Sequence, residues 1–241
     1  MPLKIKVCTL TYLLHDNGYE LYFNRDEQLS RSIAIPPQFN HLIKAIYPVD
    51  PQGGGTWLAV NQQGLSLALL NNYQVSTSET KNSLSRGKLI LLLLQHKGCL
   101  IKQLETMELK FYRPFQLCIF PADLSIQNNN IGCVKWDGKN LKKHNHDLPI
   151  TSSSVDYFNV KKIRQLKFNQ LVDSKIITSE HLRRFHYSTE KTGKYSVNMQ
   201  RNDAKTVSIS HITVNQQVSY HYFDQHHNKN CTVTKSKNNH H

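Results

Sequence analysis

The sequence has few cysteines, and no two of them stand close together. The five cysteines are at positions 8, 99, 118, 133 and 231, with no CxxC motif and no cysteine–histidine spacing typical of a metal site. Such a pattern indicates neither a disulfide framework nor a structural zinc site. We therefore expect no bound metal, no cofactor and a reducing compartment.

The sequence also lacks a long apolar run. A membrane-spanning helix needs about 18 apolar residues. The most apolar stretch, residues 89–94, is closed by His96, Lys97 and Gly98. The N-terminal residues MPLKIK are basic, but polar residues follow where a signal peptide has its apolar region. We expect no transmembrane segment and a cytoplasmic location.

Acidic residues are the minority among the charged side chains. Lys and Arg number 30 against 17 Asp and Glu, which gives a formal net charge of +13. Such an excess favours anionic partners. The basic residues are scattered, however, and no nucleic-acid-binding motif accompanies them. We expect an anionic small molecule as substrate or ligand and no nucleic-acid partner, and the sequence leaves the oligomeric state open.

Composition and patterning indicate a soluble α+β protein. With 241 residues, 39% apolar and 20% charged, the chain is long enough to bury a large core. Predicted strands alternate with groups of helices, which is typical of antiparallel sheets with segregated helices. Strands are predicted at 7–14, 19–24, 57–60, 65–70, 115–120, 131–136, 206–214 and 218–223, and helices at 88–95, 99–107, 160–172 and 179–186. The proline-containing stretch 28–52 is predicted to be irregular, and 225–241 to be a disordered polar tail.

The first two predicted strands bring a cysteine close to a polar cluster. The turn at 15–18 ends in Asn17-Gly18, and Asn-Gly is the strongest short-range signal for a hairpin. Antiparallel pairing about this turn places Cys8 roughly opposite residues 24–27. The hairpin alone is therefore expected to bring the thiol and the polar cluster together.

Cys8 is a candidate nucleophile whose base is the open question. A thiol is only slightly ionised at neutral pH and needs a base to react. None of the 13 histidines stands in a recognisable motif. A free α-amine, with a pKa of about 7.7–8.0, suits the role. Cys8 can use its own amine only as the first residue, because Val7 turns that nitrogen into an amide.

Three polar residues complete the candidate site. Asn72 ends a predicted strand, where its amide is placed to stabilise an oxyanion. Arg25 and Asp26 are expected to form a charge-assisted pair that orients the amine or binds a substrate carboxylate. The structural alternatives are a buried core thiol at Cys8, an ordinary salt bridge between Arg25 and Asp26, and a turn residue at Asn72.

These residues belong to motifs that resemble a known family. The stretch Phe23-Asn24-Arg25-Asp26-Glu27 resembles the signature of the NRDE family, the group that includes transport and Golgi organisation protein 2. Further agreement is found in CTL at 8–10, GGTWLAVN at 54–61 followed by Gly64, Asn72-Tyr73, and Ser85-Arg86-Gly87. Looser matches continue beyond these motifs, so the resemblance covers about residues 7–223.

That family is in turn similar to N-terminal-nucleophile (Ntn) hydrolases, especially the bile-salt and penicillin V acylase branch. The resemblance implies a single domain over 8–224, a four-layer αββα sandwich of antiparallel sheets flanked by helices, and cleavage of a non-peptide amide C–N bond. It implies Cys8 as nucleophile and base, Arg25 and Asp26 as positioning residues, and Asn72 as oxyanion donor. The substrate-binding residues that it implies are Asn24, Glu27, Trp57, Asn61 and Arg86.

The chain departs from the family pattern in two ways. The acylases order their polar pair as Arg-Asn-x-Asp, whereas this chain reads Asn24-Arg25-Asp26-Glu27, so the assigned roles are open to a shift of one residue. Family members usually begin Met-Cys, but here residues 1–7 precede Cys8. This extension is interpreted as a self-cleaved propeptide, as a retained segment that leaves the site inactive, or as a wrongly assigned start. We favour the third, because a GTG start codon translated as an internal codon gives valine, the residue before Cys8.

The alternative hypothesis is a non-catalytic protein on the same fold. The positive net charge and the 13 histidines are compatible with binding or trafficking of haem or an acyl lipid. Haem is expected as a ligand only in this alternative.

Overall fold

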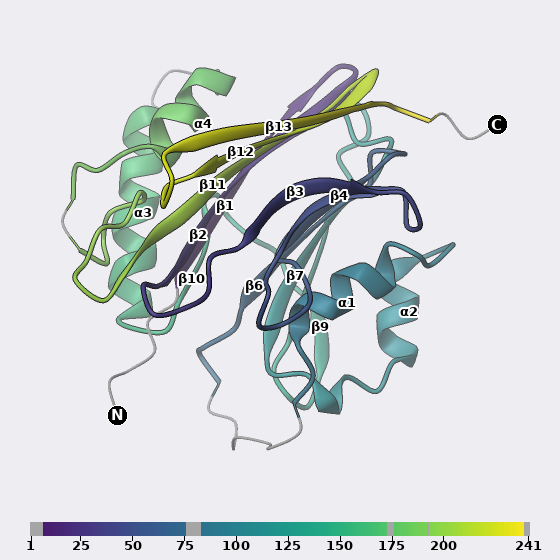
Figure 1. Ribbon diagram of the computed structural model, residues 1–241, viewed down its shortest axis with the longest axis horizontal. Coiled ribbons are helices and arrows are strands. Elements are labelled where there is room, and N and C mark those ends of the chain that lie inside the picture. The colour runs from purple at the N-terminus through teal and green to yellow at the C-terminus, as the bar shows by residue number, and fades with distance from the viewer. Residues whose placement is uncertain (1–6, 76–82, 173–175, 192, 239–241) are drawn as a thin grey trace.

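Two antiparallel sheets packed face to face form the centre of the molecule, and helices cover the outer face of each (Figure 1). This computed structural model describes residues 7–75, 83–172, 176–191 and 193–238. Residues 1–6 of the predicted extension and 239–241 of the predicted tail lie outside the described residues. The arrangement confirms the predicted α+β class and the four-layer αββα sandwich.

The first sheet contains the predicted hairpin. Its strand order is β10-β1-β2-β11-β12-β13, and every pairing is antiparallel. Gly18 closes the turn with a φ of 143°, a conformation that residues with a Cβ rarely adopt. The bounds are β1 Val7–His15, β2 Gly18–Gln28, β10 Ile150–Ser153, β11 Ala204–Val214, β12 Gln217–Asp224 and β13 Lys229–Ser236.

The second sheet has the order β3-β4-β5-β6-β7-β8-β9, again with antiparallel pairings. Apart from the first two and the last, its strands fall close to predicted positions. The bounds are β3 Ile35–Asn40, β4 Ala45–Val49, β5 Leu58–Asn61, β6 Ser66–Asn71, β7 Phe115–Phe120, β8 Gly132–Trp136 and β9 Leu141–Lys143.

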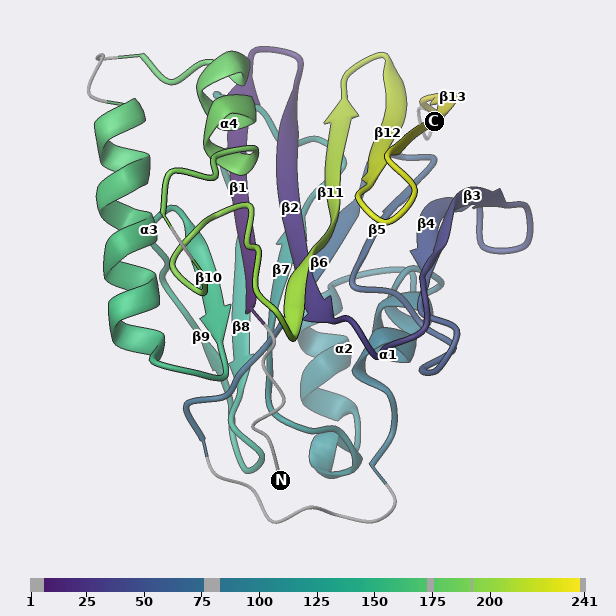
Figure 2. The same cartoon turned by 60° about the vertical axis from the view of Figure 1, so that its left-hand side comes forward.

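The two sheets divide the apolar core into three layers, one between the sheets and one between each sheet and its helices. Figure 2 shows the two helix pairs on opposite sides of the sheets. Helices α3 (Tyr157–Leu171) and α4 (Ser179–His186) cover the first sheet, whereas α1 (Arg86–Leu93) and α2 (Leu100–Thr106) cover the second, followed by a 3₁₀ turn at Leu109–Phe111. Each fully buried large apolar side chain contributes about 1.5–3 kcal/mol. None of the helices in the described part of the chain has the length and apolar content that a membrane span requires.

The prediction that 28–52 is irregular is wrong, because this stretch contains β3 and β4. The stretch was predicted to be irregular because it contains several prolines, and proline cannot donate a hydrogen bond to a neighbouring strand. Pro36 and Pro37 are nevertheless tolerated because β3 is an edge strand, and Pro48 lies near the end of β4.

The prediction that residues 225–241 form a disordered tail is also wrong for most of the residues that the structure describes there. Residues 229–236 form β13, which pairs antiparallel with β12 along its whole length. Cys231 and Val233 on this strand pack against the core between the sheets, while the intervening positions are exposed. Two alternating apolar residues among lysines and asparagines were too weak a strand signal in the sequence.

Candidate active site

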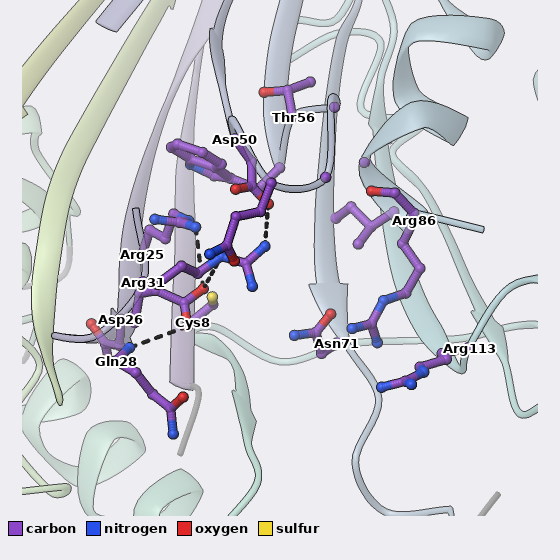
Figure 3. A pocket seen from close by; sticks show the side chains of 18 of the residues that line it. Cys8, Arg25, Asp26, Gln28, Arg31, Asp50, Thr56, Asn71, Arg86 and Arg113 are labelled. Carbon is purple, nitrogen blue, oxygen red and sulfur yellow. Dashed lines mark hydrogen bonds and ion pairs between the residues drawn. The ribbon is translucent and has the colours of Figure 1, made fainter. Parts of the chain in front are cut away.

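A cavity of about 680 Å³ lies beside Cys8, where β1, β2 and β6 meet the loop before β5 and the start of α1 (Figure 3). Several of the predicted site residues line it together, which the hairpin register and the sheet packing explain. These are Cys8, Arg25, Asp26, Glu27, Trp57 and Arg86. The other three predicted residues, Asn24, Asn61 and Asn72, are not among its lining residues.

Cys8 and Arg25 are direct partners across the hairpin. The register pairs Cys8 with Arg25 on β2 and with Ser152 on β10. Directly opposed residues of antiparallel strands point to the same face of the sheet. Arg25 lies over the ring of Trp57, 4.3 Å from the centroid, and its Nη2 donates to Glu27 Oε2 at 3.1 Å.

The predicted pair between Arg25 and Asp26 is wrong. Successive side chains of a strand point to opposite faces, so Arg25 and Glu27 face the cavity side while the Asp26 carboxylate faces the helices. There Asp26 pairs with Arg164 of α3 at 3.3 Å, and neither side chain is exposed. The β2–β11 register shifts between Thr206 and Ser208, opposite this point. The sequence prediction ended the strand at residue 24 and therefore missed the alternation.

Asp26 lies in a fully buried polar cluster behind Cys8. Thr206 Oγ1 donates to Asp26 Oδ1 at 2.6 Å, and Arg164 also contacts the Thr9 hydroxyl. Burial raises the pKa of Asp26 to about 6, although Arg164 and Thr206 oppose the rise. The backbone N–H of Asp26 donates to the thiol of Cys8. The contacts with Thr206 and Arg164 tie β2 to β11 and α3 on the side of the sheet away from the thiol.

The raised pKa of Asp26 is expected to make the free energy of unfolding depend on pH. Its folded-state pKa of about 6 lies above the ordinary 3.8, so the folded protein keeps this proton to higher pH. The contribution of this proton to the free energy of unfolding is fully present below the ordinary pKa of 3.8 and is lost as the pH rises through the folded-state pKa of about 6. The free energy of unfolding of the wild type, relative to Asp26→Asn, should thus fall by about 3 kcal/mol from pH 3.5 to 7.

Urea unfolding of both proteins across that pH range measures this difference. Asp147→Asn, the same substitution at an exposed position, controls for the chemical change. A difference between wild type and Asp26→Asn that stays constant with pH would contradict the raised pKa.

While Val7 precedes it, Cys8 has no free α-amine that could act as the base for its thiol. Burial raises the pKa of Cys8 to about 12, and the negative charge of Asp26 adds to the rise. No histidine is found among the described residues that line the cavity. Val7 is fully buried and pairs with Ser153, so the nitrogen of Cys8 is a peptide nitrogen inside β1. In this form the thiol is protonated at neutral pH.

The cavity wall on the β6 side contains Asn71 and not Asn72. Asn72 Nδ2 donates to the carbonyl of Trp136 at 3.4 Å, away from the cavity. Asn71 and Tyr73 line the cavity, and the amide of Asn71 donates to the hydroxyl of Tyr73. Of the two neighbouring asparagines, the one that lines the cavity is therefore Asn71 and not the predicted Asn72, because successive side chains of a strand point to opposite faces.

Arg31 and Arg113, which the sequence analysis did not select, line this cavity together with Arg25 and Arg86. The four arginines outnumber the three acidic residues of the lining by one, so the cavity has a small excess of positive charge. Arg31 Nε lies 3.4 Å from Glu27 Oε2, and Arg31 also contacts Asp50. Arg86 Nη1 donates to the carbonyl of Pro114 at 2.9 Å, and Arg113 lies beside it in the wall. Burial and the nearby charge of Arg113 lower the pKa of Arg86, while Tyr73 opposes this. An arginine remains charged under such conditions.

Two of the sequence motifs meet at the cavity because their glycines touch. A Cβ on Gly55 would lie 2.3 Å from the carbonyl carbon of Gly87, which no real side chain tolerates. The backbone N–H of Thr56 donates to the carbonyl of Gly87 at 3.2 Å. The close approach explains why both segments need glycine and how Arg86 reaches the cavity wall.

Asn24 and Asn61 have structural contacts elsewhere, so the prediction that they bind substrate in this cavity is wrong. Asn24 Nδ2 donates to the carbonyls of His186 and Val197 at 2.8 and 3.0 Å, which ties β2 to α4 and the segment after it. Asn61 Oδ1 accepts the N–H groups of Gln63 and Leu65 and so closes the turn before β6.

Comparisons with known proteins agree with this fold. The chain is similar to a conjugated bile acid hydrolase from Clostridium perfringens, with a TM-score of 0.50 and 13% identity over 96% of this chain and 93% of the other. It is also similar to a Caenorhabditis elegans orthologue of N-acylethanolamine-hydrolyzing acid amidase, with a TM-score of 0.51 and 12% identity over 86% and 92%. At such identities the likeness concerns the fold alone.

Sequence comparison then identifies the family. A search of curated proteins gives no match. A family model, described as transport and Golgi organisation 2, matches residues 8–235, which is nearly the whole chain and includes the described cavity residues. The chain therefore belongs to the transport and Golgi organisation 2 family.

Proposed function

We propose that this chain is a cysteine Ntn-type hydrolase that cleaves a non-peptide amide C–N bond of a small anionic acyl or amino-acid substrate. The single observation that supports it most is the position of Cys8, in the wall of a large cationic cavity at the start of β1. The two structural neighbours are named as hydrolases of bile acid conjugates and of N-acylethanolamines, and both names describe amides of an acyl group.

The reaction requires Cys8 as the first residue. Its free amine then takes the thiol proton, and the thiolate attacks the carbonyl carbon of the amide. Asn71, in place of Asn72, donates to the oxyanion, and the C–N bond breaks as the leaving amine takes up the proton. Water then hydrolyses the thioester and releases the acid. Asp26 and Arg164 hold the strand that positions Cys8 and remain behind the reacting atoms.

The cavity charge favours an anionic substrate. Four arginines line the cavity against three acidic residues, and two of the arginines, Arg86 and Arg113, lie on the side of Asn71. A carboxylate bound by Arg86 places the adjoining part of a small molecule between this wall and Cys8 (Figure 3).

A chain that starts at Cys8 provides the test. The protein is expressed with Met directly before Cys8, and its intact mass establishes that Cys8 is N-terminal. Release of amine from a panel of N-acyl amino acids and acyl conjugates is then measured. We expect turnover by this chain, none by its Cys8→Ala variant, and none by the chain that retains Val7. Equal turnover by the Cys8→Ala variant would refute the hydrolase.

A binding function on the same cavity is the second candidate, and the burial of Val7 within β1 favours it. A chain that keeps Val7 retains the cavity but has no free α-amine at Cys8. In that case we expect the full chain to bind haem or an acyl carboxylate saturably with 1:1 stoichiometry, as measured by haem absorbance or by calorimetry. Neither the full chain nor the chain that starts at Cys8 should then turn over an amide substrate.

A further inference from the structure

Two cysteines away from the candidate site, Cys118 on β7 and Cys133 on β8, face the core between the two sheets. The register places them directly opposite each other, and their Sγ atoms are 3.4 Å apart. Both are free thiols. Opposed residues in an antiparallel pair have Cα atoms about 4.5–5.5 Å apart, within the range of about 4.4–6.8 Å that a disulfide spans. The backbone is therefore already arranged for a bond between them.

The two sulfurs differ in their polar neighbours, because Gln116 hydrogen-bonds both of them whereas His146 hydrogen-bonds Cys133. Gln116 Nε2 donates to Cys133 Sγ at 3.2 Å, and the side chain of His146 also hydrogen-bonds Cys133. His146 is held in turn by Tyr12, whose hydroxyl is 3.3 Å from Nε2. Donors that converge on one sulfur stabilise it as a thiolate. The two cysteines are thus chemically different.

The ionisation of the two thiols follows this asymmetry. The hydrogen bond with Cys118 lowers the pKa of Cys133, burial opposes this, and His146 and Gln116 lower it further. The same hydrogen bond, together with burial, raises the pKa of Cys118. Cys133 is the better nucleophile of the two, and Cys118 keeps its proton.

Access to the pair is restricted to small molecules. Cys118 is 0% exposed and Cys133 5%, and the half-buried His146 lies next to the more exposed sulfur. A bulky disulfide cannot align with a sulfur that is so nearly covered, whereas hydrogen peroxide is close to water in size. Cys133 is thus the more exposed residue of the pair.

We propose that Cys118 and Cys133 form a peroxide-reactive dithiol, in which Cys133 reacts first and Cys118 resolves the product as an internal disulfide. The Cys133 thiolate attacks hydrogen peroxide, an S–O bond forms, the O–O bond breaks, and hydroxide leaves and takes up a proton as water. The Cys118 sulfur then attacks Cys133, the S–O bond breaks, and the thiol proton leaves with the hydroxide as a second water. Two thiols are oxidised, and one peroxide is reduced to two waters.

Peptide mapping after limited oxidation tests the proposal. The reduced full chain is treated with one equivalent of hydrogen peroxide at neutral pH, quenched, denatured, and alkylated at its remaining thiols. We expect a peptide that links Cys118 to Cys133, a mass loss of two hydrogens per chain, and reversal by dithiothreitol. The exposed Cys99 serves as an internal comparison. Oxidation of Cys99 while Cys118 and Cys133 remain thiols would overturn the proposal.

Single substitutions distinguish the two roles. In Cys118→Ser, dimedone should trap a sulfenic acid at Cys133, whereas Cys133→Ser should lower the oxidation rate of Cys118 at least about tenfold. His146→Gln should slow disulfide formation about tenfold without preventing it, since only the stabilisation of the thiolate is lost. Cys99→Ser, the matched control, should leave the rate unchanged. Undiminished oxidation of Cys118 in Cys133→Ser would refute the assigned order.

Discussion

Replacing Arg164 with methionine is expected to lower the free energy of unfolding by about 3–5 kcal/mol near pH 8, because it leaves a buried carboxylate without its charge partner. The side chains of Arg164 and Asp26 are both 0% exposed, and Arg164 Nη2 lies 3.3 Å from Asp26 Oδ2. Arg164 also contacts the hydroxyl of Thr9 and the carbonyl of Ser196, so the same substitution removes further buried hydrogen bonds. Urea or thermal unfolding measures the loss.

Two features separate this electrostatic effect from a simple loss of packing. At pH 5, below the Asp26 pKa of about 6, the carboxyl is already mostly protonated and needs no charge partner, so the loss should be smaller at pH 5 than at pH 8. Adding Asp26→Asn to the variant should restore part of the stability for the same reason. Arg183→Met removes an exposed ion pair with Glu180 from the neighbouring helix and should leave the unfolding midpoint nearly unchanged. Equal losses at both pH values would contradict the argument.

The sequence was most informative where local rules determine the structure. The Asn17-Gly18 turn defines the β1–β2 hairpin, and pairing outward from it leads to the observed partner of Cys8, Arg25. Most helices, and the strands β8, β11 and β12 of the second half, follow from hydrophobic periodicity alone, whereas β9, β10 and β13 were not predicted. The glycine motifs were recognised as a resemblance, and the contact between Gly55 and Gly87 now explains them physically.

The errors arose where long-range packing determines the structure. Strand β2 continues through Asn24-Arg25-Asp26-Glu27 because two opposite layers bury these polar residues, a condition that no local propensity reports. Arg164 is the clearest example, since a basic residue on an amphipathic helix is normally solvated. The pairing of Cys118 with Cys133 depends on the β7–β8 register, which the intervening loop does not reveal.

Exposing Cys8 as the first residue is expected to raise its rate of alkylation by iodoacetamide about 100-fold at neutral pH. Burial holds the pKa of the thiol at about 12 while Val7 precedes it. A neighbouring ammonium group and a more open site would bring it toward about 8.5, which increases the thiolate fraction by about 3.5 powers of ten. Lower basicity also reduces nucleophilicity, by about 1.6 powers of ten, so that about 100-fold remains.

Peptide mapping of the alkylated protein measures this rate for each cysteine. The exposed Cys99 should react equally fast in the chain that begins at Met1 and in the chain that begins at Cys8, and therefore controls for reagent and folding. A similar rate for Cys8 in both chains would mean that the amine does not activate the thiol, which would remove the chemical basis of the hydrolase without affecting the cavity. A selective rise at Cys8 would show an activated nucleophile before any substrate is known, because alkylation depends on the thiolate and not on recognition of the acyl group.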